Sequence, residues 1–196
     1  MELKTNRLIL RKPKVSDWKD IVEGIGDYEV SKNMSNVPYP YNKKDALIWI
    51  NKTIEKLKNK EQYNFLIELK SEKKVIGCIS IEHIDKFVGI ATTGSWINKK
   101  YWKKGYITEA KFAANNFAFN VLKIRKLNST VFVDNLASNK TQQSIGYSFE
   151  GCKRGNARSK ASGKIKDVNL YGLFKNEWTK KVKEIRDKIK RYNQSL

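Results

Sequence analysis

The segment GSWINKKYWKKGYITEA, residues 94–110, joins a predicted strand to a predicted helix through a short basic loop. Lys103 and Lys104 precede Gly105 in this loop, and a helical pattern begins at Tyr106. The first turn of a helix leaves about four backbone N–H groups without partners and carries the positive end of the helix dipole, so this junction can hold a diphosphate. The GxxxxGKS/T and GxGxxG patterns are absent. Because basic loops before helices are also typical of solvated surfaces, the residue types alone leave both interpretations open.

Other kinds of site chemistry are poorly supported by the residues. His83 is the only histidine, so any Ser-His-Asp or Cys-His arrangement would have to use it. Cys78 and Cys152 do not form a CxxC pair, which argues against a disulfide framework and against a zinc site. We therefore expect reduced thiols and no metal, and hydrolase or metalloenzyme functions are disfavoured.

Composition indicates one globular domain with a strong positive charge. The chain has 196 residues with 40% hydrophobic residues, enough to bury a core. Its net charge of +20 would attract a polyanion, but lysine outnumbers arginine 33 to seven, so compositional lysine bias explains the charge equally well. No apolar run is long enough for a membrane span and no signal peptide is evident, so we expect a cytoplasmic protein without membrane contact.

Hydrophobic periodicity predicts a mixed α/β sheet rather than a strictly alternating parallel one. A polar loop is expected at 154–166, and an amphipathic helix is expected at the C-terminus with a two-heptad seam. This helix is expected to dock on its own domain or to pair with a second subunit. The predicted strands are 7–11, 63–69, 75–83, 89–97, 127–133, 148–153 and 167–174, and the predicted helices are 17–25, one capped by Asn42, one starting at Tyr106, and 137–145.

The stretch WKKGYITEA resembles the acetyl-CoA signature Q/R-x-x-G-x-G/A of the GNAT superfamily of N-acetyltransferases. Trp102 stands at the Q/R position, Gly105 at the central glycine and Ile107 at the final small position. The RimJ/RimL-type branch often reads W-G-K-G-Y-A-T-E-A here. Because the implied contacts are backbone N–H groups, the side-chain departures affect affinity rather than mechanism. The resemblance implies that the diphosphate is held by residues Trp102, Lys103, Lys104, Gly105, Tyr106, Ile107 and Thr108.

The resemblance continues in order from about residue 5 to 178. TNRLILRK is similar to the family's first strand, GSWI at 94–97 to its fourth, and DVNLYGLFKNEW to its last. The implied structure is the GNAT acyl-CoA N-acyltransferase fold: a central, mostly antiparallel sheet flanked by helices. In this fold a bulge splays the fourth strand from the fifth, and the pantetheine arm lies between them. We expect a GNAT domain at 1–178 and an appended amphipathic basic helix at 179–196.

The family transfers the acetyl group directly to an amine, which implies roles for particular residues. Segment 134–151 is similar to the branch's N-x-x-S motif, so Asn135 would bind the pantetheine and Ser138 would bind it and protonate the leaving thiolate. A backbone donor near Trp96 or Ile97 would stabilise the oxyanion. Asn135 and Ser138 fit equally well as helix caps.

The general base is less well defined by the resemblance. Glu82 is the first candidate, acting through water, and Glu61 the second; either fits equally as a surface carboxylate. Relatives place a glutamate where this chain has Tyr63, so a water chain alone is a further alternative. His83 is expected to face the other side of the strand from Glu82 as a core or surface residue.

The implied function is acetyl-CoA-dependent acetylation of a primary amine, with a protein N-terminal α-amine of the ribosomal-protein type as the expected acceptor. Acceptor amines are cations, so Glu61, Glu82 or Asp85 would have to reverse the positive field locally, which disfavours polyamines. The alternatives are acetylation of a small amine, either an antibiotic or a polyamine, and a catalytically idle module that binds RNA or the ribosome through its lysines. Both a monomer and a homodimer are compatible with the sequence.

Overall fold

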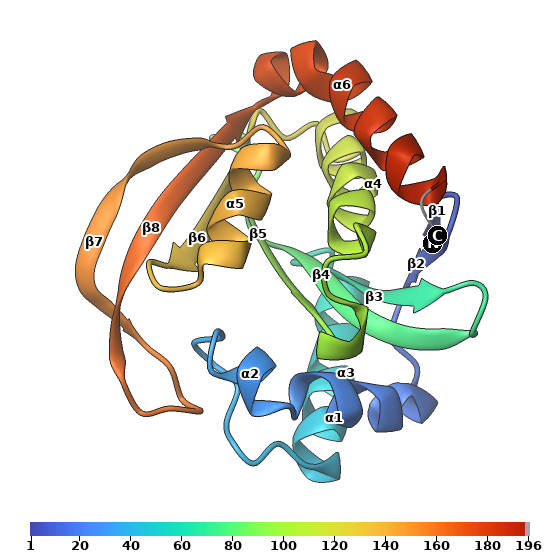
Figure 1. Cartoon of the computed structure of the whole chain (residues 1–196), viewed down its shortest axis with the longest axis vertical. Helices are drawn as coiled ribbons and strands as arrows, with labels where there is room; N and C mark the ends of the chain where they lie inside the picture. The colour runs from blue at the N-terminus through green and yellow to red at the C-terminus, as the bar shows by residue number, and fades with distance from the viewer. Residues whose placement is uncertain (195–196) are drawn as a thin grey trace.

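The computed structural model describes residues 1–194, and across this range eight strands form one sheet in the order β1-β2-β3-β4-β5-β6-β8-β7 (Figure 1). All neighbouring strands are antiparallel except β5 and β6, which are parallel. The strands are β1 (Glu2–Lys4), β2 (Leu8–Arg11), β3 (Tyr63–Leu69), β4 (Lys74–Asp85), β5 (Ile90–Ile97), β6 (Lys126–Phe132), β7 (Ser148–Arg158) and β8 (Ile165–Phe174). The predicted mixed, mostly antiparallel sheet is confirmed.

Helices cover both faces of this sheet (Figure 1). One face carries α1 and α3, and the other carries α4 with α5 and α6 beside it. The helices are α1 (Trp18–Ile25), α2 (Tyr28–Ser31), α3 (Lys43–Lys58), α4 (Tyr106–Asn120), α5 (Leu136–Ser144) and α6 (Lys175–Gln194), with short 3-10 turns η1 (Val15–Asp17) and η2 (Lys99–Tyr101). None of the helices described is long and apolar enough to cross a membrane.

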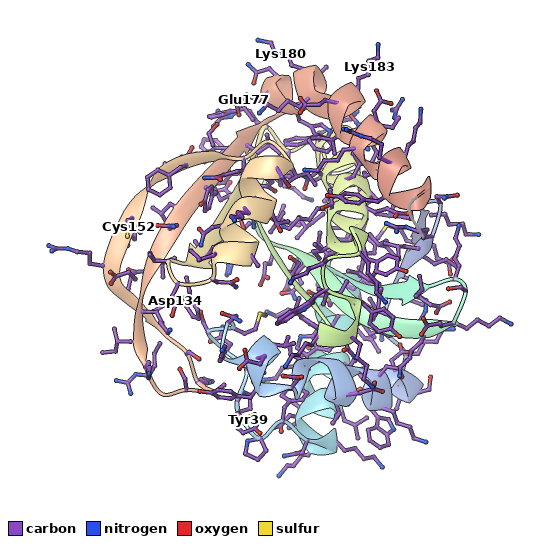
Figure 2. The ribbon with its side chains drawn as sticks, viewed as in Figure 1. Tyr39, Asp134, Cys152, Glu177, Lys180 and Lys183 are labelled. Carbon is purple, nitrogen blue, oxygen red and sulfur yellow. The ribbon has the colours of Figure 1, made fainter. Side chains whose placement is uncertain are left out.

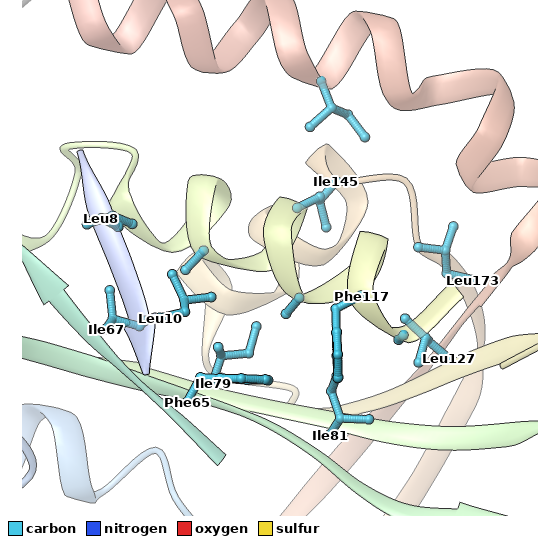
Figure 3. Close-up of a cluster of buried hydrophobic side chains, with 14 of the residues drawn as sticks. Leu8, Leu10, Phe65, Ile67, Ile79, Ile81, Phe117, Leu127, Ile145 and Leu173 are labelled. Carbon is cyan, nitrogen blue, oxygen red and sulfur yellow. The ribbon is translucent and has the colours of Figure 1, made fainter. Parts of the chain in front are cut away.

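Two hydrophobic clusters form because alternate strand residues point to opposite faces of the sheet. The larger one lies under α4, where Leu10, Phe65 and Phe117 are almost completely buried (Figure 3). The smaller one lies under α1 and α3 and contains Ile50 and Trp96. The core is therefore divided by the sheet, and residues on β4 and β5 alternate between the two halves.

The helix boundaries follow the capping signals in the sequence. The Asn42 side chain accepts hydrogen bonds from the amides of Lys44 and Asp45, and the Asp45 carboxylate accepts one from the Asn42 amide, which completes a capping box for α3. Gly105, with a φ of +75°, is the N-cap of α4. Both starts were predicted from the sequence.

The expected loop at 154–166 is wrong. Strand β7 runs on to Arg158 and β8 begins at Ile165, so only the turn between them is irregular. Nearly every residue of β7 is exposed, including polar and basic residues on both of its faces, so the alternation that marks a half-buried strand is missing. The pattern also did not predict the short elements β1 and α2.

The C-terminal helix α6 packs on α4 of the same chain, which is one of the two arrangements expected; the other was pairing with a second subunit. Trp178 is buried against Phe112 and Phe119, and its indole N–H donates to Asn116 Oδ1 at 3.0 Å. Further along α6, Ile185 and Ile189 belong with Trp178 to the larger core cluster. Residues 195–196 of the expected helix lie outside the described residues, and the domain boundary at 178 stays a prediction.

A lysine is buried in the same half of the core. Lys111 on α4 is 2% exposed, and its Nζ donates to Gln142 Oε1 of α5 at 3.4 Å. Desolvation lowers its pKa from 10.5 to about 8. No acidic side chain within residues 1–194 forms an ion pair with it. Burial of this cation therefore opposes folding at neutral pH.

We predict that Lys111→Met stabilises the protein at pH 7. The folded-state pKa lies below the unfolded value, so between about pH 8 and pH 10.5 the unfolded chain binds more protons and wild-type stability rises with pH. The substitution should remove this rise and add up to about 3 kcal/mol to the free energy of unfolding at pH 7. Urea unfolding at several pH values measures both effects.

Lys140→Met is the matched control, because it removes the same charge from an exposed position on α5. It should leave the pH dependence of stability as in the wild type, since exposed charges interact weakly. A Lys111→Met protein that is less stable than the wild type at pH 7, with an unchanged pH dependence, would contradict the account of a desolvated ammonium.

Candidate functional site

The central feature of the site is an opening between the two parallel strands. Strands β5 and β6 pair only from Ile90 to Thr92, opposite Lys126 to Asn128. At the next position they are joined through side chains, because Ser129 Oγ donates to the Thr93 carbonyl at 3.2 Å and Thr93 Oγ1 to the Asn128 carbonyl at 3.3 Å. No ladder pairing between β5 and β6 follows within the described residues. The expected splay of these strands is confirmed.

The bulge expected in the strand at 89–97 is not found between Thr92 and Ile97. The ladder between β4 and β5 keeps a regular register from Gly77↔Ile97 to Glu82↔Thr92, and its register shift lies between Glu82 and Asp85. His83, with a φ of +51°, sits in this irregular segment. The two strands thus part while β5 stays paired with β4 and β6 stays paired with β8.

Backbone groups of β5 therefore face the opening without a strand partner. The Asn98 amide donates to the Ile76 carbonyl of the β4 side at 2.8 Å, whereas the Thr93 carbonyl points toward β6. Successive residues of a strand direct their backbone groups to alternate sides. Both backbone groups of Ser95 and the amide of Ile97 consequently face the opening, the Ile97 carbonyl accepts a hydrogen bond from the Trp102 indole, and the backbone groups of Trp96 point toward β4. Of the two predicted oxyanion donors, this geometry favours Ile97.

The Trp96 side chain has a packing role. It is 8% exposed and belongs to the core cluster under α1 and α3. A Cβ on Gly24 of α1 would lie 2.6 Å from the Trp96 ring, so the helix backbone rests directly on the indole. Trp96 thus fixes the distance between α1 and β5 from the side of the sheet opposite α4.

The N-terminus of α4 lies beyond the end of β5. Lys103 and Gly105 both adopt positive φ, +62° and +75°, in the connecting loop. Since Gly105 provides no side-chain cap, the first-turn amides of Tyr106, Ile107 and Thr108 have no capping side chain. These amides lie at the positive end of the helix dipole beside exposed lysines, as the predicted diphosphate site requires.

Residues that were not predicted hold this loop in place. Arg7 donates from Nη1 to the Lys104 carbonyl at 3.0 Å and from Nε to Glu109 at 2.7 Å, and it lies 4.4 Å from the Tyr106 ring centre. Glu109 is 1% exposed and also accepts a hydrogen bond from Thr5. The N-terminal strand segment thus clamps both the loop and the first turn of α4. Arg7 and Glu109 lie in the quoted segments TNRLILRK and WKKGYITEA, but nothing in either segment indicates their pairing.

Two aromatic residues complete the loop. Trp102, at the Q/R position of the signature, donates its indole N–H to the Ile97 carbonyl at 2.9 Å. It therefore ties the loop back to the end of β5. Tyr192 of α6 packs against Gly105, where an added Cβ would lie 2.6 Å from its ring. Position 105 therefore requires glycine for two reasons: there is no room for a side chain, and its φ is left-handed.

The N-x-x-S motif lies at the start of α5. Its structure is compatible both with ligand-binding and catalytic roles for Asn135 and Ser138 and with helix capping. Asn135 is the N-cap, and its Oδ1 accepts a hydrogen bond from the Ser138 amide at 3.1 Å. Within residues 1–194 the half-buried Ser138 hydroxyl has no hydrogen-bond partner, so it is free to interact with a ligand. Asn139, which was not predicted, joins the end of β6 to β8 by donating to the Phe132 carbonyl and accepting from Tyr171.

The two candidate bases lie in different surroundings. Glu82 is half-buried on β4, on the face of Trp96, and accepts a hydrogen bond from Ser80 Oγ at 2.5 Å close to Gly94 of β5. Glu61 is exposed in the turn before β3, where Asn59 donates to it at 3.2 Å. Glu82 is thus one strand away from β5, and Glu61 is two.

The neighbouring candidates are also placed by the structure. Tyr63 is in edge contact with Phe117 of α4, so it faces away from the α1 and α3 side. His83 is exposed, in agreement with one of its two expected placements. No group of three or more His, Cys, Asp or Glu residues in the described part of the chain is arranged to hold a metal ion.

The β7–β8 hairpin contacts the segment that follows α2. The hairpin turn reaches this segment, where the Lys160 amide donates to the Ser35 carbonyl at 3.2 Å. The acidic groups nearby form ion pairs with lysines. Asp134, in the connection between β6 and α5, pairs with Lys166 (Figure 2 labels Asp134), and Glu29 of α2 pairs with Lys32. In this region the β7–β8 hairpin thus takes the place of the polar loop that was expected at 154–166.

Comparisons with known proteins agree with this geometry. Residues 7–148 match the acetyltransferase (GNAT) domain family. The chain is 30% identical over 179 residues to the "uncharacterized N-acetyltransferase p20" of Bacillus licheniformis, covering 90% of this chain and 97% of that protein.

Two solved structures share the fold. One is the ribosomal-protein-S5-alanine acetyltransferase of Vibrio fischeri, with a TM-score of 0.79, 17% identity and coverage of 91% of this chain and 98% of that one. The other is Mycobacterium smegmatis RimJ in complex with CoA-disulfide, with a TM-score of 0.77, 16% identity and coverage of 90% and 87%. The chain belongs to the GNAT family of N-acetyltransferases, and it is an acyltransferase.

Proposed function

We propose that this N-acetyltransferase binds acetyl-CoA across α4 and the β5–β6 opening and transfers the acetyl group to a protein N-terminal α-amine. The observation that carries the proposal is the juxtaposition of two features. The strands separate after Thr92, and the α4 amides from Tyr106 to Thr108 lack capping side chains just beyond the end of β5. The amides suit the diphosphate, and the unpaired edge of β5 suits the amide groups of an extended pantetheine arm.

Acetyl-CoA supplies the activated thioester, and residues of the chain supply orientation and proton transfer. The Ile97 amide faces the opening, so it is placed to donate to the oxygen that becomes negative when the amine attacks the carbonyl. Ser138 has a free hydroxyl at the start of α5 and would give its proton to the leaving thiolate. Glu82 would accept the amine proton through water. None of these steps needs a covalent enzyme intermediate.

The acceptor is proposed from charge and from the related structures. We place the acceptor beside α2 and the β7–β8 hairpin, where Asp134 and Glu29 are paired with lysines, which leaves little negative field for a polycation such as a polyamine. A chain terminus carries one amine at the end of an extended backbone. The Vibrio fischeri neighbour is described as acetylating a ribosomal protein. A cytoplasmic location and contact of the lysine-rich surface with ribosomal RNA form part of this proposal.

Thiol release with a panel of acceptors tests the function. We expect peptides that start with Ala or Ser to be acetylated faster than polyamines or aminoglycosides, and calorimetry to show micromolar binding of acetyl-CoA. Preferred turnover of an aminoglycoside would instead identify a small-molecule acetyltransferase. Absence of acetyl-CoA binding, together with RNA binding that falls steeply with salt, would identify an idle RNA-binding module.

Replacing Gly105 tests the diphosphate site. We predict that Gly105→Ala weakens acetyl-CoA binding by about tenfold or more, because the new Cβ would meet the Tyr192 ring at 2.6 Å and a left-handed φ is unfavourable for alanine. Calorimetry measures the change. Gly163→Ala is the matched control, since Gly163 has a φ of +70° with nothing within 4 Å of an added Cβ. Equal binding by the wild type and Gly105→Ala would argue against the assigned site.

The two carboxylates can be separated by paired substitutions. We predict that Glu82→Gln lowers kcat by about a hundredfold and leaves acetyl-CoA affinity unchanged, because a positioned base contributes on this scale. Glu61→Gln should have no effect, since Glu61 is exposed and lies two strands from β5. Steady-state kinetics with one peptide acceptor gives both values. If Glu61→Gln lowered kcat and Glu82→Gln did not, Glu61 would be the base. If neither variant had a lower kcat, water alone would accept the amine proton.

A further inference from the structure

Lys111 lies beneath the point where β5 and β6 part. Its Nζ donates to Gln142 Oε1 at 3.4 Å, and Gln142 Nε2 donates to Ser129 Oγ at 2.8 Å. Ser129 Oγ in turn donates to the Thr93 carbonyl, the last contact that joins the two strands. A chain of three hydrogen bonds therefore connects the lysine of α4 to the floor of the opening.

The surroundings of Lys111 contain more hydrogen-bond donors than acceptors. An ammonium has three N–H donors, and here it has one long hydrogen bond and the Tyr147 ring, whose centre is 5.8 Å away. One turn further along α4, Asn115 Nδ2 is buried without a partner. No carboxylate among the described residues pairs with Lys111. Its positive field is thus not neutralised and acts in a region shielded from water.

Lys111 is also linked to the helix that carries the proposed acid. Gln142 follows Ser138 by one helical turn on α5, so the two side chains lie on the same face. The hydrogen bond from Lys111 to Gln142 holds α4 and α5 together directly below Ser138. A negative charge that forms beside the Ser138 hydroxyl would therefore develop close to the ammonium.

We propose that Lys111 is a positioning residue whose buried positive charge stabilises the thiolate that leaves acetyl-CoA. The proposal rests on the function proposed above. As the amine nitrogen bonds to the acetyl carbon, the carbon–sulfur bond breaks and its electron pair stays on sulfur. Ser138 protonates that sulfur and regains a proton from water, and the proton that the amine loses passes through water to Glu82 and from there back to solvent. Lys111 makes and breaks no bond, and it acts through its charge and through Gln142.

The titration of Lys111 can be observed separately from that of its neighbours. Burial lowers its pKa to about 8. The titratable groups that face it are Tyr147 from the start of β7 and, behind Asn139, Tyr171 from β8, and burial raises the pKa of both. On α4 itself Glu109 is bound to Arg7, and from α6 Lys181 lies over Gly146 next to Tyr147. The facing residues of α5, β5 and β6 are the uncharged side chains Gln142, Thr93 and Ser129.

The test compares pH–rate profiles of the wild type, Lys111→Met, Lys111→Arg and Lys140→Met with one peptide acceptor, from about pH 6 to about pH 10. We expect wild-type kcat/KM for acetyl-CoA to fall above about pH 8. Below that pH, Lys111→Met should have a kcat about tenfold or more lower than the wild type. Its kcat/KM should not fall above about pH 8, and its stability should not be reduced. Lys111→Arg should keep activity to higher pH, because the guanidinium does not deprotonate. Lys140→Met should behave as the wild type.

A merely structural lysine would give a different result. Lys111→Met would then have wild-type kcat and a wild-type pH profile, and this would overturn the proposal while the proposed function stands. A wild-type profile with no fall near pH 8 would overturn it without the need for any variant. A wild-type chain that neither binds nor consumes acetyl-CoA would overturn the proposed function, and this proposal with it.

Discussion

The site depends on a single constraint, the brief parallel pairing of β5 and β6. Three residue pairs join these strands. Beyond them, within residues 1–194, β5 is paired only with β4 on its other side. An unpaired strand edge in the middle of a sheet is costly unless its N–H and C=O groups find partners. Here the edge lies next to the uncapped start of α4, so one ligand with a polar extended arm and a diphosphate could satisfy both. The surrounding structure keeps β5 and β6 separated at this point.

Contacts far apart in the sequence maintain the opening. On one side of the sheet Trp96 supports β5 against α1, and on the other Arg7 and Glu109 fix the loop before α4. Tyr192, near the end of α6, packs against Gly105 and links the C-terminal helix to the same loop. Substitutions far from the opening should therefore change acyl-CoA binding when they loosen one of these contacts.

The sequence predicted most of the fold and the position of the loop before α4, but not the contacts that hold this loop in place. Capping residues and apolar periodicity located the starts of α3 and α4, and the signature around Gly105 identified the family. Strand β7 was missed beyond its first residues because it is exposed on both faces and therefore carries no burial pattern. The pairing of Arg7 with Glu109 bridges distant segments, and no local rule predicts such a contact. Lys111 follows Ala110 on a buried helix face, whereas lysine as a residue type favours solvent. The roles of Ser138, Glu82 and Glu61 remain predictions.

Amide NMR spectra recorded during titration with CoA test the central claim most directly. The account predicts that the amides of residues 105–108 and those of Ser95 and Ile97 shift together and become protected from hydrogen exchange, while those of the β4–β5 ladder change little. Saturable shifts confined to another surface, with these amides unaffected, would contradict it.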